Sequence, residues 1–259
     1  MNAHLRVGLR HLHGNLFKEY LEQYLRPLLI KGVPSVMMDL REFYKVPEKI
    51  EIIGQYLLGC IASMEQEMTL RPGDEEEQDP TVQLWLYYYM AQHCMFLNNL
   101  NEALEFVDKA IEHTPTLLEL YTLKGTIFQK QGDRTRAAVL YEEARNLDKA
   151  DRAINAQSAM MTLKTGDVER GTTIMDIFVK DCGYDVSIHD NQTMWFEHMC
   201  GRAHYQNGNY RQALKELKYT QLHAEHMVQD HYDYYQYMFR KFTLKSFEDL
   251  LKFADKTLK

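Results

Sequence analysis

Glycine and proline are scarce in this sequence, with 13 glycines and 6 prolines among 259 residues. Turns between short strands depend on these two residues, so the shortage argues against an all-β chain and favours a mostly helical one. The hydrophobic content of 45% is enough to form a continuous core. The composition excludes a disordered or fibrous protein and predicts a folded, helix-rich chain.

Long apolar runs are also lacking. No segment approaches the ~20 consecutive apolar residues of a membrane span. Arginine and histidine interrupt the N-terminal stretch MNAHLRVGLRHLHGNLF, so it has no signal-peptide core. The four cysteines, Cys60, Cys94, Cys182 and Cys200, form no CxxC pair and are typical of buried thiols in a reducing compartment. We therefore expect a cytoplasmic protein that does not contact a membrane.

An excess of positive charge is missing as well. The chain has 30 Lys and Arg residues against 37 Asp and Glu residues, which gives a net charge of −7. Binding to a phosphate backbone requires a local surplus of cations. This balance argues against direct DNA binding as the main function.

Two stretches, 71–80 and 181–185, interrupt the helical patterns with proline, glycine and acidic residues. Before the first stretch the sequence predicts helices near 15–30, 34–44 and 48–69, with Gly32 at a helix C-cap. We expect four parts: an N-terminal helical segment (1–73), an acidic solvated linker (74–80), a repeat region (81–185), and a degenerate repeat with C-terminal helices (186–259).

The most informative pattern is an internal repeat. A shift of 34 residues aligns Ala91 with Gly125 and Ala103 with Ala137, and aromatic residues also align. Small residues at these positions let the two helices of a hairpin approach closely, which is the tetratricopeptide (TPR) pattern. Gly201 and Ala213 mark a degenerate later copy. The predicted fold is all-α, a TPR-like helical-repeat solenoid, or α-α superhelix.

The first helix of each pair lines the concave surface of such a solenoid, which makes that surface the default binding site. The residues expected there are Trp85, Tyr88, Gln92, Glu119, Thr122, Thr126 and Gln129. The alternative is that large side chains in this set, such as Trp85, only pack against neighbouring turns.

No catalytic constellation is found. The chain has no phosphate-binding glycine loop, no HExxH and no GxSxG motif. We favour hydrogen-bonded or solvated histidines over metal ligands for His223 and His226, since no further ligand cluster accompanies them. Cys94 follows His93, but it occupies a repeat packing position, so a nucleophilic role is rejected. We predict a protein that is not an enzyme, with no metal site.

Residues 198–203, HMCGRA, approach the [RQ]xxGx[GA] loop with which GNAT-fold acetyltransferases bind the pyrophosphate of acetyl-coenzyme A. That loop works at a helix N-terminus, whereas this segment is expected inside a helix, with Gly201 as the small residue of its repeat. A second functional class, the TPR clamp for a C-terminal carboxylate, needs Lys, Asn and Arg at five positions. The chain has other residues at all five: Tyr88, Gln92, Leu123, Ala153 and Gln157.

Several short sequence motifs are informative beyond the repeat pattern. The segment RPLLIKGVPS (26–35) resembles the PLLxKGVP segment of the large auxiliary subunit of NatA-type N-terminal acetyltransferases. In the same order, TPTLLEL (114–120), LDKADRAIN (147–155), MWF (194–196) and RKFTLKSFEDLL (240–251) are similar to TPTLxEL, LDxADRxxN, MWF and RKMTLRxYxDLL of that family. The matches run across nearly the whole chain.

This resemblance implies a non-catalytic scaffold that binds and activates a GNAT-type catalytic subunit and docks it at the ribosome for co-translational N-terminal acetylation. The chain is several times shorter than a complete auxiliary subunit, which favours a fragment. Family members also hold inositol hexakisphosphate between the two subunits, and of the basic residues involved Lys130, Arg152 and Lys164 remain here. A polyphosphate needs several converging cations. The alternative function is a general TPR adaptor in chaperone or complex assembly, without a link to acetylation.

Overall fold

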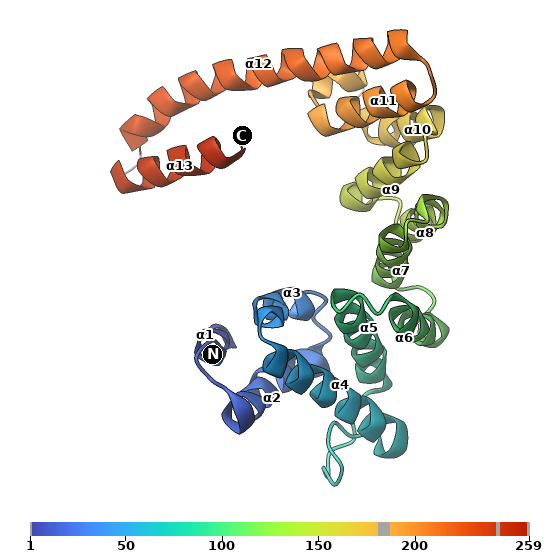
Figure 1. Cartoon of the computed structure of the whole chain (residues 1–259), viewed down its shortest axis with the longest axis vertical. Helices are drawn as coiled ribbons and strands as arrows, with labels where there is room; N and C mark the ends of the chain where they lie inside the picture. The colour runs from blue at the N-terminus through green and yellow to red at the C-terminus, as the bar shows by residue number, and fades with distance from the viewer. Residues whose placement is uncertain (1, 181–186, 242–243, 258–259) are drawn as a thin grey trace. The chain divides into compact units, whose positions relative to one another are not determined.

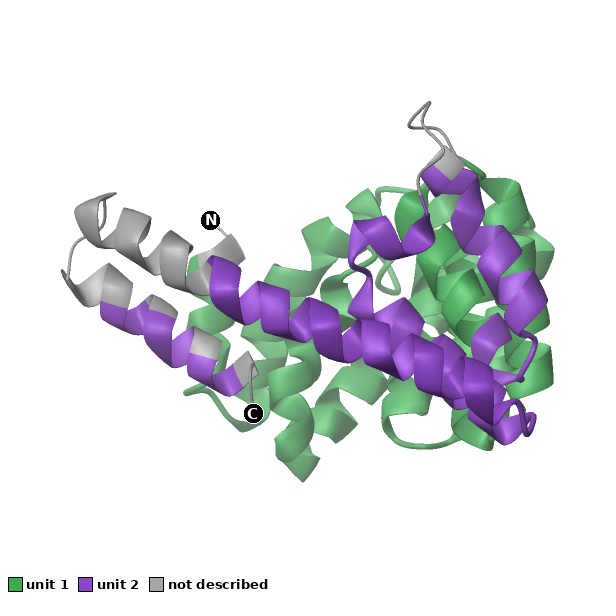
Figure 2. Ribbon diagram, turned by 90° about the horizontal axis from the view of Figure 1, so that it is seen from above, with its two compact units in different colours: residues 1–161 green, residues 162–259 purple. Residues whose placement is uncertain are grey.

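The computed structural model describes residues 2–180, 187–241 and 244–257, and within these ranges all regular elements are helices (Figure 1). The chain divides into two compact units, residues 1–161 and 162–259, with the division inside helix α9 (Arg152–Lys164) (Figure 2). The all-α class is confirmed. The division differs from the expected boundaries, because residues 1–73 pack together with the first repeats.

The first unit begins with helices that carry no repeat signature. They are α1 (Asn2–Leu9), α2 (Gly14–Lys31), α3 (Val36–Leu40), the 3-10 helix η1 (Arg41–Lys45) and α4 (Pro47–Glu67). Gly32 ends α2 in the left-handed conformation, with φ at 66°, as predicted for a C-cap. The helix expected over 34–44 is split into α3 and η1, and α1 was not expected.

A buried lysine fixes the short helix α1. The Lys49 Nζ atom donates to the carbonyl oxygens of Leu9 at 2.8 Å and Arg10 at 3.2 Å, where α1 ends. It also lies over the rings of Phe17 and Phe43, 4.8 Å and 5.2 Å from their centroids. Burial lowers the pKa of Lys49, and the carbonyl groups and aromatic faces offset part of its desolvation.

Two helical hairpins follow in the first unit: α5 (Pro80–Phe96) with α6 (Leu100–His113), and α7 (Leu118–Gln131) with α8 (Arg134–Leu147). A Cβ atom built on Gly125 would lie 3.4 Å from the Ala137 carbonyl oxygen and 2.9 Å from the Tyr141 ring. The two helices therefore touch through the small residues that the repeat alignment selected. Ala91, Ala103, Ala137 and Ala144 are all fully buried.

The second unit contains α10 (Val168–Lys180), the 3-10 helix η2 (Ile188–Asn191), α11 (Met194–Gln206), α12 (Tyr210–Lys241) and α13 (Leu244–Thr257). Gly201 lies inside α11 and contacts α12, since a Cβ atom there would lie 3.4 Å from the Ala213 carbonyl oxygen. The acetyltransferase-like segment 198–203 is thus helical packing, as predicted. Among the described residues, none of the helices is both long enough and apolar enough to cross a membrane.

Candidate protein-interaction surface

The first helix of the first hairpin, α5, was expected to expose its inner face. This expectation was wrong for Tyr88 and Gln92, which are only 8% and 6% exposed. Helices α2 and α3 pack on α5 and cover it, and the Tyr89 hydroxyl donates to the Val33 carbonyl oxygen at 2.9 Å. The interaction surface expected on α5 is therefore largely an internal interface of the first unit.

Trp85 shows how closely this internal interface is packed. A Cβ atom on Gly32 would lie 2.2 Å from the Trp85 Nε1 atom, so only glycine fits beneath the indole. The indole also meets the Tyr88 ring edge-on, with centroids 5.5 Å apart. The packing alternative for Trp85 is supported by these contacts. They also give Gly32 a second role besides ending α2.

The corresponding face of α7 remains partly accessible. Glu119, Thr122, Thr126 and Gln129 are half-buried. The Thr126 hydroxyl lies 2.9 Å from the Tyr141 hydroxyl and donates to the Thr122 carbonyl oxygen at 2.8 Å, so it serves the hairpin itself. The Thr122 hydroxyl likewise donates to the Glu119 carbonyl oxygen at 2.9 Å, which leaves Glu119 and Gln129 as the more available members of the predicted set.

Glu119 has an unusual environment on this face. Its Oε2 atom is buried and accepts no hydrogen bond from any described residue. Burial, followed by the negative charge of Glu119, raises the pKa of Tyr88 to about 12. A buried carboxylate oxygen without a donor costs free energy, about 1–3 kcal/mol for an unsatisfied polar group. The Oε2 atom is closed off from solvent, so a partner could reach only the remaining, half-exposed part of Glu119.

The basic residues expected to bind inositol phosphate do not form one described cluster. The Lys130 Nζ atom donates to the Met95 carbonyl oxygen at 3.2 Å, and Arg152 is exposed at the start of α9. Lys164 is half-buried and belongs to the second unit. Inositol phosphate binding remains a prediction.

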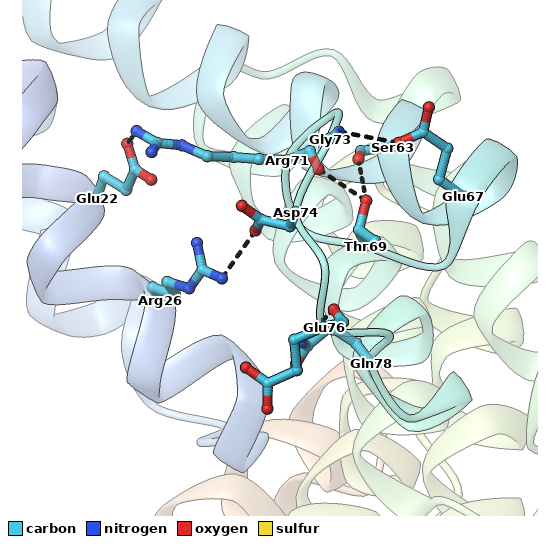
Figure 3. Close-up of polar contacts among 10 residues, drawn as sticks. All are labelled: Glu22, Arg26, Ser63, Glu67, Thr69, Arg71, Gly73, Asp74, Glu76 and Gln78. Carbon is cyan, nitrogen blue, oxygen red and sulfur yellow. Dashed lines mark hydrogen bonds and ion pairs between the residues drawn. The ribbon is translucent and has the colours of Figure 1, made fainter.

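The acidic segment between α4 and α5 is mostly exposed, and it is also anchored to the neighbouring helices. Arg26 of α2 binds Asp74 at 2.8 Å, and Arg71 pairs with Glu22 (Figure 3). The Gln78 backbone N–H donates to the Met68 carbonyl oxygen at 2.7 Å. Asp74 is half-buried and Gln78 is buried, because these contacts tie the loop to α2 and α4, whereas Glu75, Glu76, Glu77 and Asp79 are exposed.

Polar clusters in the second unit are structural. Glu197 is 1% exposed and accepts from His223 Nδ1 at 2.8 Å and His189 Nδ1 at 3.2 Å. His223 is therefore hydrogen-bonded, as predicted, whereas the role of Glu197 was missed, because no spacing in the sequence links residues 189, 197 and 223. Among the described residues, no group of histidine, cysteine or acidic side chains could hold a metal ion.

The thiols are also poorly suited to nucleophilic chemistry. Cys60, Cys94 and Cys200 are buried and unpaired, as predicted, and burial raises the pKa of the Cys94 thiol to about 12. The neighbouring His93 is hydrogen-bonded through its Nδ1 atom to the Tyr44 hydroxyl, at 2.5 Å. Cys182 lies outside the described residues.

These features define a helical-repeat scaffold. The sequence model of one family, "N-terminal acetyltransferase A, auxiliary subunit", matches residues 1–259, and the chain belongs to this family. This family contains the auxiliary subunit, as the sequence motifs indicated, and not the catalytic subunit.

Individual relatives agree with this assignment. The chain is 35% identical over 251 residues to the N-terminal acetyltransferase A complex auxiliary subunit NAA15 of Arabidopsis thaliana, covering 97% of this chain and 28% of the relative. It is 31% identical over 252 residues to the NatA auxiliary subunit N-alpha-acetyltransferase 16 of Mus musculus, covering 96% and 29%. The chain therefore spans less than a third of these relatives.

Solved structures show the same fold. A chain of the structure described as Naa15/Naa10 bound to HypK-THB matches with a TM-score of 0.81 and 26% identity, over 98% of this chain and 38% of that chain. A kinesin light chain with TPR-like repeats from Podospora anserina matches with a TM-score of 0.55 and 16% identity, over 78% of this chain and 96% of that chain. The second likeness concerns the fold alone and supports the TPR-like assignment.

Proposed function

We propose that this chain is part of an auxiliary scaffold subunit. This subunit binds a GNAT-type catalytic subunit and activates it for N-terminal protein acetylation. The observation that carries the proposal is the match of the whole chain to the auxiliary-subunit family, together with the structural likeness to Naa15 in a complex named with Naa10.

The α7 face supplies the contact that we propose for the catalytic subunit. The half-buried Glu119 would present its negative charge to an arginine or lysine of the partner. Thr122 and Gln129 lie on the same face of α7 and would border this contact.

Purified components test the proposal. The catalytic subunit from the same cell should bind the chain, and Glu119→Lys should weaken binding by about tenfold or more, since it places two like charges together. The matched control is Glu143→Lys, a change of the same charge at an exposed position of α8. Equal losses in both variants would show that general charge, not the α7 face, determines binding.

Activity and location complete the proposal. The chain alone should transfer no acetyl group, while its addition should raise the activity of the catalytic subunit. We further propose a cytoplasmic complex that associates with ribosomes. Co-sedimentation of the chain with ribosomes, in the presence and absence of the catalytic subunit, tests this part separately. Recovery of chaperones without an acetyltransferase would instead favour the general adaptor.

A further inference from the structure

The α11–α12 hairpin has the same internal geometry as the α7–α8 hairpin. A Cβ atom on Gly201 would lie 2.9 Å from Leu217 Cγ and 3.4 Å from the Ala213 carbonyl oxygen. On Gly125 the corresponding distances are 2.9 Å to the Tyr141 ring and 3.4 Å to the Ala137 carbonyl oxygen. The second helices of the hairpins can therefore be compared position by position.

In the first hairpin, the outer positions of the second helix are covered. Leu100 and Leu104 of α6 are partly buried against the core that continues into α7. In α12 the equivalent residues are Tyr210 and Leu214. Their exposures are 61% and 70%. The face on which α6 receives the next helix is thus bare on α12.

The bare face extends onto the preceding helix. Tyr205 of α11 is 65% exposed, and its ring meets that of Tyr210 edge-on with centroids 5.6 Å apart. We call Tyr205, Tyr210 and Leu214 the α11–α12 patch. A contiguous group of large exposed apolar side chains, as opposed to scattered ones, marks an interaction site.

The border of the α11–α12 patch is basic. Arg211, Lys215 and Lys218 are exposed on α12, and none of them forms an ion pair with a residue that the structure describes. The nearest acid in sequence, Glu216, is turned toward His189, with its Oε1 atom 3.8 Å from His189 Nε2. The cations are therefore available to a ligand.

We propose that the α11–α12 patch is a docking surface for an acidic amphipathic helix of a partner protein, which packs on α12 as α7 packs on α6. The helix-on-helix register follows from the shared hairpin geometry. The acidic border of the partner helix follows from the three cations, which all lie on one side of the patch along α12. The inference does not depend on acetyltransferase binding, because it uses a different unit of the chain from the α7 face.

A labelled synthetic helix tests this surface directly. The probe is a peptide of about 20 residues with a leucine stripe at helical spacing and glutamate on both borders. Two peptides serve as controls: the same stripe with lysine borders, and a scrambled sequence of the acidic peptide. Fluorescence anisotropy with the full chain should show binding of the acidic probe only, weakened when salt rises from about 0.05 to about 0.5 M.

Matched variants locate the site. Leu214→Glu should reduce probe binding by about tenfold or more, whereas Val139→Glu, at a 54% exposed position of α8, should not. Lys218→Glu should shift preference toward the lysine-bordered peptide. Equal binding of the scrambled peptide, no binding of the acidic probe, or self-association of the chain that Leu214→Glu abolishes would each overturn the proposal.

Discussion

Replacing Gly125 with alanine should destabilise the first unit, although alanine is the better helix former. The added Cβ would lie 2.9 Å from the Cδ2 and Cε2 atoms of Tyr141, closer than real Cβ contacts allow. The ring has little room to move, because Tyr141 is 6% exposed and its hydroxyl lies 2.9 Å from that of Thr126. The substitution therefore sets packing against helix propensity at a single position.

The magnitudes decide which effect is larger. Overpacking costs about 1–3 kcal/mol, and loss of the Tyr141–Thr126 hydrogen bond costs about 1 kcal/mol. Alanine returns about 1 kcal/mol through helix propensity, so the net loss is about 1–3 kcal/mol. The control is Gly59→Ala in α4, an exposed position where a Cβ meets nothing within 4 Å. That variant should gain about 0.5–1 kcal/mol.

Urea unfolding measures both variants. The two tryptophans lie in different units, so Trp85 fluorescence in a Trp195→Phe background reports on the first unit alone. A second substitution, Tyr141→Val, should reduce the loss of stability caused by Gly125→Ala. The double variant would have the alanine and valine that the first hairpin has at the equivalent positions, Ala91 and Val107. The reasoning is refuted if Gly125→Ala stabilises the unit as much as Gly59→Ala does.

Two further predictions concern a helix cap and the buried thiols. Asp133 caps α8 by accepting from the Arg136 backbone N–H at 2.9 Å, so Asp133→Ala should cost about 1 kcal/mol in urea unfolding, while Asp133→Asn should cost much less. Burial raises the pKa of Cys60 to about 11 and of Cys94 and Cys200 to about 12. The contribution of these thiols to the free energy of unfolding is fully present below the unfolded-state pKa near 9. It should fall as the pH rises above 9, because only the thiols of the unfolded chain ionise there. An unchanged urea midpoint between pH 8 and pH 10 would contradict this prediction.

The repeat hairpins were predictable because their signal is local. Gly125 with Ala137 and Gly201 with Ala213 are each separated by the length of one helix and one turn, and a small residue in each helix suffices for close packing. The C-cap at Gly32 was predictable for the same reason. Short motifs outside the repeat pattern, such as RPLLIKGVPS at 26–35, identified the family, which the sequence comparison confirms.

The coverage of α5 was not predictable from periodicity. Repeat spacing places Tyr88 and Gln92 on the inner face of the helix, but it does not show that α2 and α3, which lack the small-residue pattern, pack against that face. The anchored loop was missed for a related reason, since Arg26 and Asp74 are 48 residues apart. Helix α1 depends on Lys49, which lies 40 residues beyond Leu9.

Purification of the tagged protein from its source cell, in the longest form that the cell makes, tests the central claim most directly. Mass spectrometry and an acetyl-transfer assay on the same eluate should reveal a GNAT-type subunit and N-terminal acetyltransferase activity, both reduced by Glu119→Lys and retained by Glu143→Lys. An eluate that contains chaperones but neither a GNAT-type subunit nor acetyltransferase activity would contradict the auxiliary role.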